Sequence, residues 1–292
     1  MDCMIASPRS WREFWVEVAP FNLLEFARIG GRETLVPAVP FDPNTGQIVR
    51  TINVSAIFNQ GNIIENSYKE EYMDFGSNVQ DIIATVIYTD IPEDAVFSKK
   101  KSLEVQLADT LEVDAIRQTF DLSLYVTNPE QAILFGKLIC NLRRYVRQAI
   151  EFKTYPTLDP ISPGAFVYVD IGQNSWDAIR TGTIGVGGAL NIPLDNGLLS
   201  GTYNFRLYRS DRGLLDVNTV TVTNGVAPQL ADYENFLFVL GVETTTRRIF
   251  RVSEVQMDEE GEITVRATIY PCTTDGQSLI ADFSDNLFTI RR

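Results

Sequence analysis

Residues 128–150 read NPEQAILFGKLICNLRRYVRQAI, and this stretch decides the fold because the hydrophobic period of the chain changes there. Asn128 is a typical helix N-cap residue, and Pro129 is well tolerated at the first helical position. Apolar residues then recur at steps of three and four, as expected for one face of a helix. They are Ala132, Phe135, Ile139, Leu142, Val146 and Ala149. The stretch therefore predicts a long amphipathic helix over 129–152.

The segments on both sides of this helix have the pattern of β-strands. Alternation with period two and clusters of β-branched residues mark these strands. Upstream, the candidates are 48–58, 82–89, 103–107 and 120–127; downstream they are 165–171, 203–208, 217–223, 236–242, 248–255 and 262–270. The last two are predicted to form a hairpin across the loop Asp258-Glu259-Glu260-Gly261. Pro163-Gly164 is a turn signal before the first downstream strand.

The N-terminal region predicts a short helix followed by a hairpin. Ser10 and Glu13 have the spacing of a capping box, and the apolar residues that follow have helical spacing over 10–19. Pro20 is expected to end this helix. Residues 22–40 then read as two short strands joined at Gly30-Gly31.

These elements predict a mainly β protein of the α+β class. We expect β-barrel-like or sandwich-like domains of the tail-tube type with one long helix between them. The predicted division is an N-terminal helix plus β domain over 1–128, the long amphipathic helix packing on the β domains over 129–152, and a C-terminal β-barrel-like domain over 153–292.

Composition excludes many enzyme classes. The 292 residues contain no histidine, which removes Ser-His-Asp hydrolases, Cys-His hydrolases and zinc sites that depend on imidazole. The net charge of −13 argues against a protein that grips nucleic acid by neutralising phosphates. The three cysteines, Cys3, Cys140 and Cys272, form no CxxC pair, so we expect reduced thiols. No apolar run reaches the 18 residues of a membrane span, and the N-terminus lacks the features of a secretory signal.

Two other patterns resemble chemical sites, and we interpret both as structural. The glycines of GTIGVGGAL at 182–190 resemble a phosphate loop, but Pro193 and the turn Asp195-Asn196-Gly197 leave no room for the helix that such a loop needs. The carboxylate clusters, at 70–71, 90–94 and 258–260, lie at turns or element ends and are interpreted as solvated surface charge. We therefore expect no catalytic residue, no cofactor and no metal ion.

The residues that we single out are candidates for subunit contacts. Trp11 and Trp15 lie four apart on the predicted N-terminal helix, where they form either a packing face or an exposed aromatic surface. Trp176 is a further candidate for an exposed aromatic surface. Lys137, Arg143, Arg144 and Arg147 make 129–152 the one locally basic stretch. These cations are expected to pair with carboxylates of the same fold or of a neighbouring subunit, with phosphate or membrane contact as the alternative.

The order of these signals resembles the tail-tip or baseplate central hub proteins of tailed bacteriophages. In that family a helix of the A…G…N.RR type leads into a strand, a Pro-Gly turn begins the next, and a late hairpin closes a β domain. The residues that carry the resemblance are Ala132, Gly136, Arg143, Arg144, Pro163, Gly164, Arg251, Val252, Gly261, Val265, Ala267 and Tyr270. The helix and hairpin at the N-terminus look similar to the region that precedes them in hub proteins.

The resemblance implies a structural virion protein without enzymatic activity. It implies a homo-oligomeric ring, expected to be a trimer, that joins the tail tube or distal tail protein to a spike or fibre protein. Viral DNA would pass through the ring during ejection without specific binding, with assembly in the host bacterial cytoplasm and no membrane contact. The alternative from the residues is a virion-associated carbohydrate-binding or receptor-binding β module. A carboxylate-based glycan hydrolase is a third possibility.

Overall fold

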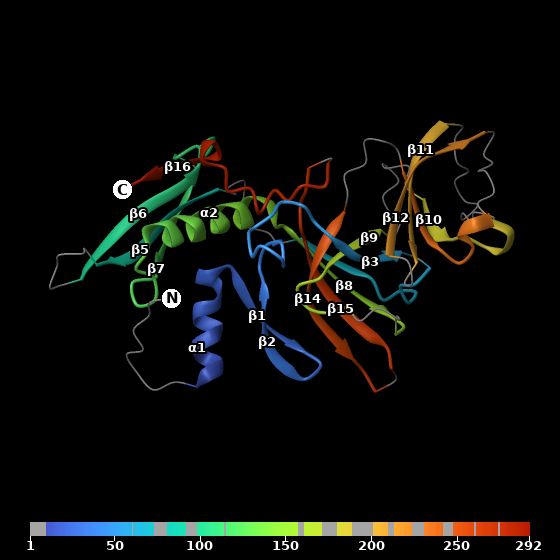
Figure 1. Cartoon of the computed structure of the whole chain (residues 1–292), viewed down its shortest axis with the longest axis horizontal. Helices are drawn as coiled ribbons and strands as arrows, with labels where there is room; N and C mark the ends of the chain where they lie inside the picture. Colours follow the sequence, from blue (N-terminus) through green and yellow to red (C-terminus); the bar gives the residue numbers. More distant parts are fainter. Residues whose placement is uncertain are drawn as a thin grey trace. The chain divides into compact units, whose positions relative to one another are not determined.

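The computed structural model describes residues 10–59, 61–72, 81–91, 98–113, 115–156, 161–170, 180–188, 201–209, 213–223, 231–241, 248–259, 261–273 and 275–292. The chain divides into two compact units, each assembled from separate segments (Figure 1). Unit 1 comprises 1–51, 72–148 and 277–292, and unit 2 comprises 52–71 and 149–276. The chain therefore leaves unit 1 twice and returns to it twice.

Unit 1 contains a four-stranded sheet covered on one face by a helix (Figure 1). The strand order is β16-β6-β5-β7, with bounds Phe288–Arg291, Lys99–Leu107, Ile82–Asp90 and Ile116–Asp121. β5 pairs antiparallel with β6 and parallel with β7, and β16 pairs antiparallel with β6. Helix α2, Pro129–Tyr145, packs on β5 and β6.

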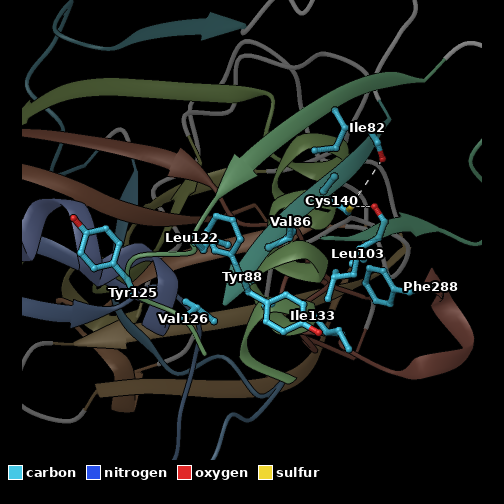
Figure 2. Close-up of a cluster of buried hydrophobic side chains, with 14 of the residues drawn as sticks. Ile82, Val86, Tyr88, Leu103, Leu122, Tyr125, Val126, Ile133, Cys140 and Phe288 are labelled. Carbon is cyan, nitrogen blue, oxygen red and sulfur yellow. Dashed lines mark hydrogen bonds between the residues drawn. The ribbon is translucent and has the colours of Figure 1, made fainter. Parts of the chain in front are cut away.

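The core of unit 1 lies between this sheet and α2 (Figure 2). Alternate residues of the strands face the helix, because successive side chains of a strand point to opposite faces. From the sheet these are Ile82, Ala84, Val86, Tyr88, Leu103, Val105 and Leu107; from α2 they are Ala132, Ile133, Phe135 and Cys140. The Cys140 thiol lies 3.4 Å from the carbonyl oxygen of Val105, so even the sulfur is enclosed by the sheet.

The N-terminal part of unit 1 forms as the sequence predicts. Helix α1, Trp11–Val18, begins with a complete capping box between Ser10 and Glu13. The 3-10 turn η1, Ala19–Asn22, follows, with Pro20 inside it. Strands β1, Leu24–Ile29, and β2, Arg32–Pro37, form an antiparallel hairpin. Gly30 and Gly31 have φ values of 56° and 79°, the left-handed backbone that glycine allows without a steric cost.

Unit 2 contains a six-stranded sheet of order β3-β9-β14-β15-β8-β4. The bounds are Val54–Asn59, Phe166–Asp170, Ile249–Met257, Ile263–Ile269, Gln148–Thr154 and Lys69–Tyr72. β3 and β9 are parallel, whereas β9–β14, β14–β15 and β15–β8 are antiparallel pairs. The predicted hairpin of the last two long strands is therefore confirmed as β14–β15.

A second sheet of unit 2 has the order β10-β13-β11-β12. Its strands are Arg180–Thr183, Leu237–Gly241, Gly201–Arg209 and Gly213–Val222. Its buried core includes Ile184, Leu207, Phe236, Phe238 and Leu240. Asn59, at the end of β3, is fully buried and donates from its side-chain amide to the Phe238 carbonyl oxygen at 3.3 Å, which links the two sheets.

The α+β, mainly β class is confirmed, and three element predictions are wrong in part. Helix α2 ends at Tyr145, because residues from Gln148 alternate between buried and half-buried and pair with β15 instead. The strand predicted at 48–58 begins only at Val54, since the chain passes from unit 1 to unit 2 after Thr51. The strand predicted at 120–127 ends at Asp121, where Leu122 begins a turn closed by hydrogen bonds from Tyr125 and Val126.

The two units are compact regions in space, whereas the division predicted from the sequence cuts the chain at residues 128 and 152. Helix α2 belongs to unit 1 together with most of 1–128, and the segment after Gln148 enters unit 2. The segment after Gly276 then returns to unit 1. The expected division into 1–128, 129–152 and 153–292 stays a prediction.

Candidate interaction surfaces

The aromatic residues of α1 divide between core and surface. Phe14 is buried with Val18 in the unit 1 core, and Trp15 is half-buried against that core. Trp11 is 72% exposed, and its ring stands edge-on to Trp15 at 5.2 Å between centroids. Trp15 therefore serves packing, while Trp11 presents a large apolar surface to the outside.

Lys137 is a buried cation rather than a surface charge. Its residue exposure is 5%, and its Nζ donates to the Phe283 carbonyl oxygen at 2.8 Å and to the Asp285 carboxylate at 2.6 Å. The ammonium also lies 5.2 Å from the centre of the Phe288 ring, a cation–π distance. Lys137 therefore binds the C-terminal segment of the chain to α2.

Asn141, one turn further along α2, continues this attachment. Its buried side-chain amide donates to the carbonyl oxygens of Ile280 and Asp282, at 3.0 and 3.1 Å. Arg50 holds the same segment from another side, through the Ser278 carbonyl oxygen and the Asp282 carboxylate. This segment, 277–292, is the C-terminal strap of unit 1. The sequence pattern did not predict the strap or the role of Asn141.

Arg144 forms an ion-pair cluster inside unit 1. Its guanidinium donates to both oxygens of Asp81 and both of Asp109, and Thr110 donates to Asp81 at 3.1 Å. The Arg144 hydrogen bonds hold the pKa of the Asp81 carboxyl below its usual value, and they raise the pKa of Arg144. Arg144 thus pairs with carboxylates of its own fold, one of the two options that the sequence left open.

Arg143 and Arg147 flank this cluster at the C-terminal end of α2. Arg143 donates to the Gln118 side-chain oxygen at 3.2 Å, which connects the helix to β7. Arg147 donates from Nε to the Arg144 carbonyl oxygen at 3.0 Å, so it caps the helix end. Both side chains are half-buried. A role for Trp11, Trp15, Lys137, Arg143, Arg144 or Arg147 in contacts between subunits stays a prediction.

A row of alternating charges crosses the large sheet of unit 2. Glu151 accepts from Lys69 at 3.0 Å and from Arg266 at 2.7 Å, and Arg266 reaches Glu254 at 3.1 Å. These residues stand on the neighbouring strands β4, β8, β15 and β14. The pairing with Arg266 lowers the pKa of Glu151. The sequence gives no sign of this row, because its members lie far apart along the chain.

The candidates for chemistry have ordinary structural positions where the structure describes them. Gly187 lies in the 3-10 turn Val186–Gly188 with a φ of 72°, and residues 189–200 and Trp176 lie outside the described residues. Asp90 pairs with Lys101, and Asp258 with Lys153. Within the described residues, no group of three or more Cys, Asp or Glu side chains is placed to hold a metal ion.

The cysteines and helices in the described part of the chain offer no special chemistry. Cys140 and Cys272 are buried free thiols, and burial raises the pKa of Cys140 to about 12. Such a thiol is a poor nucleophile, because the thiolate is the reactive form. Among the described helices, none is both long enough and apolar enough to span a bilayer.

Comparison with known proteins gives distant structural matches. No protein family model matches the chain, and no curated protein matches it. One matching structure is a chain in the virion of a native gene transfer agent particle, with 13% identity, a TM-score of 0.39, and coverage of 77% of this chain and 33% of that chain. Another is a tail protein from Neisseria meningitidis MC58, with 10% identity, a TM-score of 0.33, and coverage of 88% of this chain and 53% of that one. The chain thus spans about a third and about half of the length of these two proteins.

Proposed function

We propose that this chain is a structural component of a phage tail tip or baseplate hub. In this proposal three copies form a ring that joins the tail tube to a spike or fibre protein, and the ring surrounds the path of the ejected DNA. One observation carries the proposal: Arg251, Val252, Val265 and Ala267 of the hub-like sequence pattern lie on the paired strands β14 and β15. The Pro163-Gly164 turn of the same pattern directly precedes β9, which pairs with β14.

The Pro-Gly turn of this pattern fixes one strand pair. Gly164 has a φ of 90° and donates its N–H to the Val252 carbonyl oxygen at 2.8 Å. Val252 in turn donates to the Ala165 carbonyl oxygen at 2.9 Å. The turn and the first half of the late hairpin, which are about ninety residues apart in the sequence, therefore form one hydrogen-bonded junction. These hydrogen bonds give a structural reason for the turn and the hairpin to occur together in the hub-like sequence pattern.

The helical half of the pattern also has packing roles. Ala132 is fully buried, and Gly136 lies where α2 touches β6. Val265 and Ala267, on the late hairpin, are also buried. Residues of this kind specify a shape rather than a reaction. Pattern residues with packing roles of this kind are consistent with a structural component of a virion.

The charge of the chain supports passage of DNA without binding. Three copies at −13 each carry −39, and a ring with that charge repels a polyanion. Each phosphate contact would add salt-dependent affinity that slows passage. We therefore expect no retention of double-stranded DNA by the purified ring at physiological salt.

The test is electron cryo-microscopy of intact particles, combined with native mass spectrometry of the purified chain under assembly conditions. We expect a closed ring of this chain at the end of the tail, with an electronegative inner surface. Purified particles that lack the chain, or density that places it away from the tail end, would overturn the proposal. A stable monomer under assembly conditions would overturn the ring.

A carbohydrate-binding or receptor-binding module is the second candidate, and the exposed Trp11 favours it. Exposed indole rings provide flat apolar surface for ligand contact. A glycan array with the full chain and with Trp11→Ala distinguishes the two functions. Binding that Trp11→Ala removes would support the module, and an array without signal would exclude it.

A further inference from the structure

Strand β7 is an edge of the four-stranded sheet, and in the described part of the chain no strand pairs with its outer side. In the order β16-β6-β5-β7 it lies outermost, and β5 is its one strand partner among the described residues. Ile116, Arg117, Thr119 and Asp121 are exposed, and the strand contains no proline. An edge of this kind is a template for pairing with a further strand.

The outward backbone groups of β7 belong to its odd-numbered residues. Ile116 and Leu122 donate their N–H groups to the carbonyl oxygens of Asp81 and Ile87, at 3.1 and 2.8 Å. Even-numbered residues therefore turn their hydrogen-bonding groups toward β5. Because these groups alternate along a strand, Arg117, Thr119 and Asp121 direct theirs away from the sheet.

We propose that β7 of one copy pairs antiparallel with β7 of a second copy, about a two-fold axis at Thr119. In this register the outward residues face one another, and Thr119 lies opposite itself. Arg117 lies opposite Asp121 of the second copy, and Asp121 opposite its Arg117. The two sheets join into one continuous sheet of eight strands.

Charge complementarity selects this register over its neighbours. A shift of two residues places Arg117 opposite Thr119 or Ser123 and leaves the opposite charges without a match. A shift of one residue sets outward backbone groups against inward ones, which breaks the hydrogen-bond ladder. The two-fold register at Thr119 alone satisfies both the backbone and the charges.

The pairing extends ion pairs that already exist within each chain. Arg117 lies 2.6 Å from Glu104, and Asp121 lies 3.2 Å from Lys100. Across the two-fold axis these pairs would form a row of alternating signs, the arrangement that unit 2 already shows around Glu151. Exposed ion pairs add little affinity, so the charges fix the register while other contacts provide the energy.

Exposed apolar side chains lie at both ends of β7. Ile116 at its start is 51% exposed and Leu124 just beyond its end is 44% exposed, and the preceding loop adds Leu111 and Val113, at 71% and 96%. Ion pairs of Asp109 with Arg144 and of Glu112 with Arg291 hold that loop in place. An antiparallel partner brings the start of one strand to the end of the other, so these side chains cover one another.

The proposed dimer is independent of the proposed function. It is a two-fold contact of unit 1 alone, separate from the contacts that would close a ring. Loss of the dimer would leave the hub proposal standing, and absence of the chain from particles would leave the dimer standing. A single pair of six-residue strands is a small interface, so we expect a concentration-dependent dimer.

A disulfide test is specific for the two-fold axis. Opposed residues of a hydrogen-bonded antiparallel pair have Cα atoms about 5.5 Å apart, within the range of disulfides. In a Cys3→Ser background, Thr119→Cys should form a covalent dimer under mild oxidation. Ser102→Cys is the matched control, because Ser102 is exposed on the same face of the sheet but lies on β6, with β5 between it and β7. Cross-linking of both variants at equal rates, or of neither, would overturn the proposal.

Charge reversal tests the register by sedimentation velocity over a concentration series. Arg117→Asp and Asp121→Arg each place like charges opposite one another at both ends of the pair, so each should weaken the dimer about tenfold or more. The double variant restores opposite charges and should dimerise like the natural sequence. A natural chain that stays monomeric, or a double variant as weak as the single ones, would overturn the proposal.

Discussion

Gly136 of α2 lies directly against Val105 of β6: a Cβ atom at position 136 would stand 2.7 Å from Val105 Cγ2 and 3.0 Å from its Cβ. The helix can approach the sheet this closely only because position 136 has no side chain. The same strand residue accepts the contact of the buried Cys140 thiol through its carbonyl oxygen, so this site sets the depth at which α2 rests on the sheet of unit 1.

Gly136→Ala is expected to destabilise unit 1. Overpacking of a filled core costs about 1–3 kcal/mol, while alanine in place of glycine returns about 1 kcal/mol of helix propensity. We expect a net loss of up to about 2 kcal/mol in the free energy of unfolding, measured by urea denaturation. Val105→Ala in the same chain removes Cγ2, the atom that the new methyl group would meet most closely, so the double variant should lose less than the sum of the two single losses. Additive losses would contradict the contact.

Lys137→Met should destabilise unit 1, although it removes a charge from a buried position. Methionine keeps the apolar stem but leaves the Phe283 carbonyl oxygen without its donor, at a cost of about 1–3 kcal/mol. Asp285→Asn is the matched control: the Asp285 side chain is 95% exposed, and Lys137 keeps its bond to Phe283. Thermal unfolding should separate the two variants clearly. Equal effects would mean that the exposed ion pair, and not the buried bond, attaches the strap.

The Arg144–Asp81 pair predicts a loss of stability in acid. Because the Arg144 hydrogen bonds lower the folded-state pKa of Asp81, the carboxylate stabilises the fold at pH values above its unfolded pKa of about 3.9. That contribution disappears as the pH falls through the lowered folded value. Asp81→Asn should therefore be less stable than the natural chain at pH 7, and the difference should shrink below about pH 4. A difference that stays constant from pH 7 to pH 2.5 would contradict this linkage.

The Cys140 thiol should be inert in the folded chain. It is 2% exposed, and its pKa of about 12 leaves almost no thiolate at neutral pH. In a Cys3→Ser variant we expect no rapid reaction with a thiol reagent until denaturant is added, since Cys272 is buried as well. Mass spectrometry of the labelled protein identifies the site. Fast labelling of Cys140 without denaturant would show that α2 separates readily from the sheet.

Local signals predicted the elements that depend on neighbouring residues. The capping box at Ser10, the Gly30-Gly31 hairpin and the start of α2 at Asn128 each rest on contacts within a few residues, and each is confirmed. The end of α2 was not predictable in this way. Val146 and Ala149 fit a helical stripe, but pairing with β15, more than a hundred residues later, draws the chain into a strand.

The sequence predicted less of the interaction surfaces than of the fold. Lys137 and Arg144 were recognised as cations on a helix, and the structure shows that both are held by carboxylates of unit 1. Which carboxylates hold them depends on tertiary structure: Asp81 and Asp285 lie in distant segments. The open edge of β7 was missed because its first residues carry no strong strand pattern, and an edge becomes visible only when the order of the strands is known.

The C-terminal strap has a consequence for the biosynthesis of the chain. Strand β16 completes the unit 1 sheet, and the strap that carries it is translated after the whole 149–276 segment of unit 2. During translation, α2 and β6 therefore lack their last partners, the strap and β16, until the 149–276 segment has been synthesised. Unit 1 can therefore complete its sheet only after the whole 149–276 segment of unit 2 has been synthesised, so the two units cannot fold one after the other in the order of the sequence.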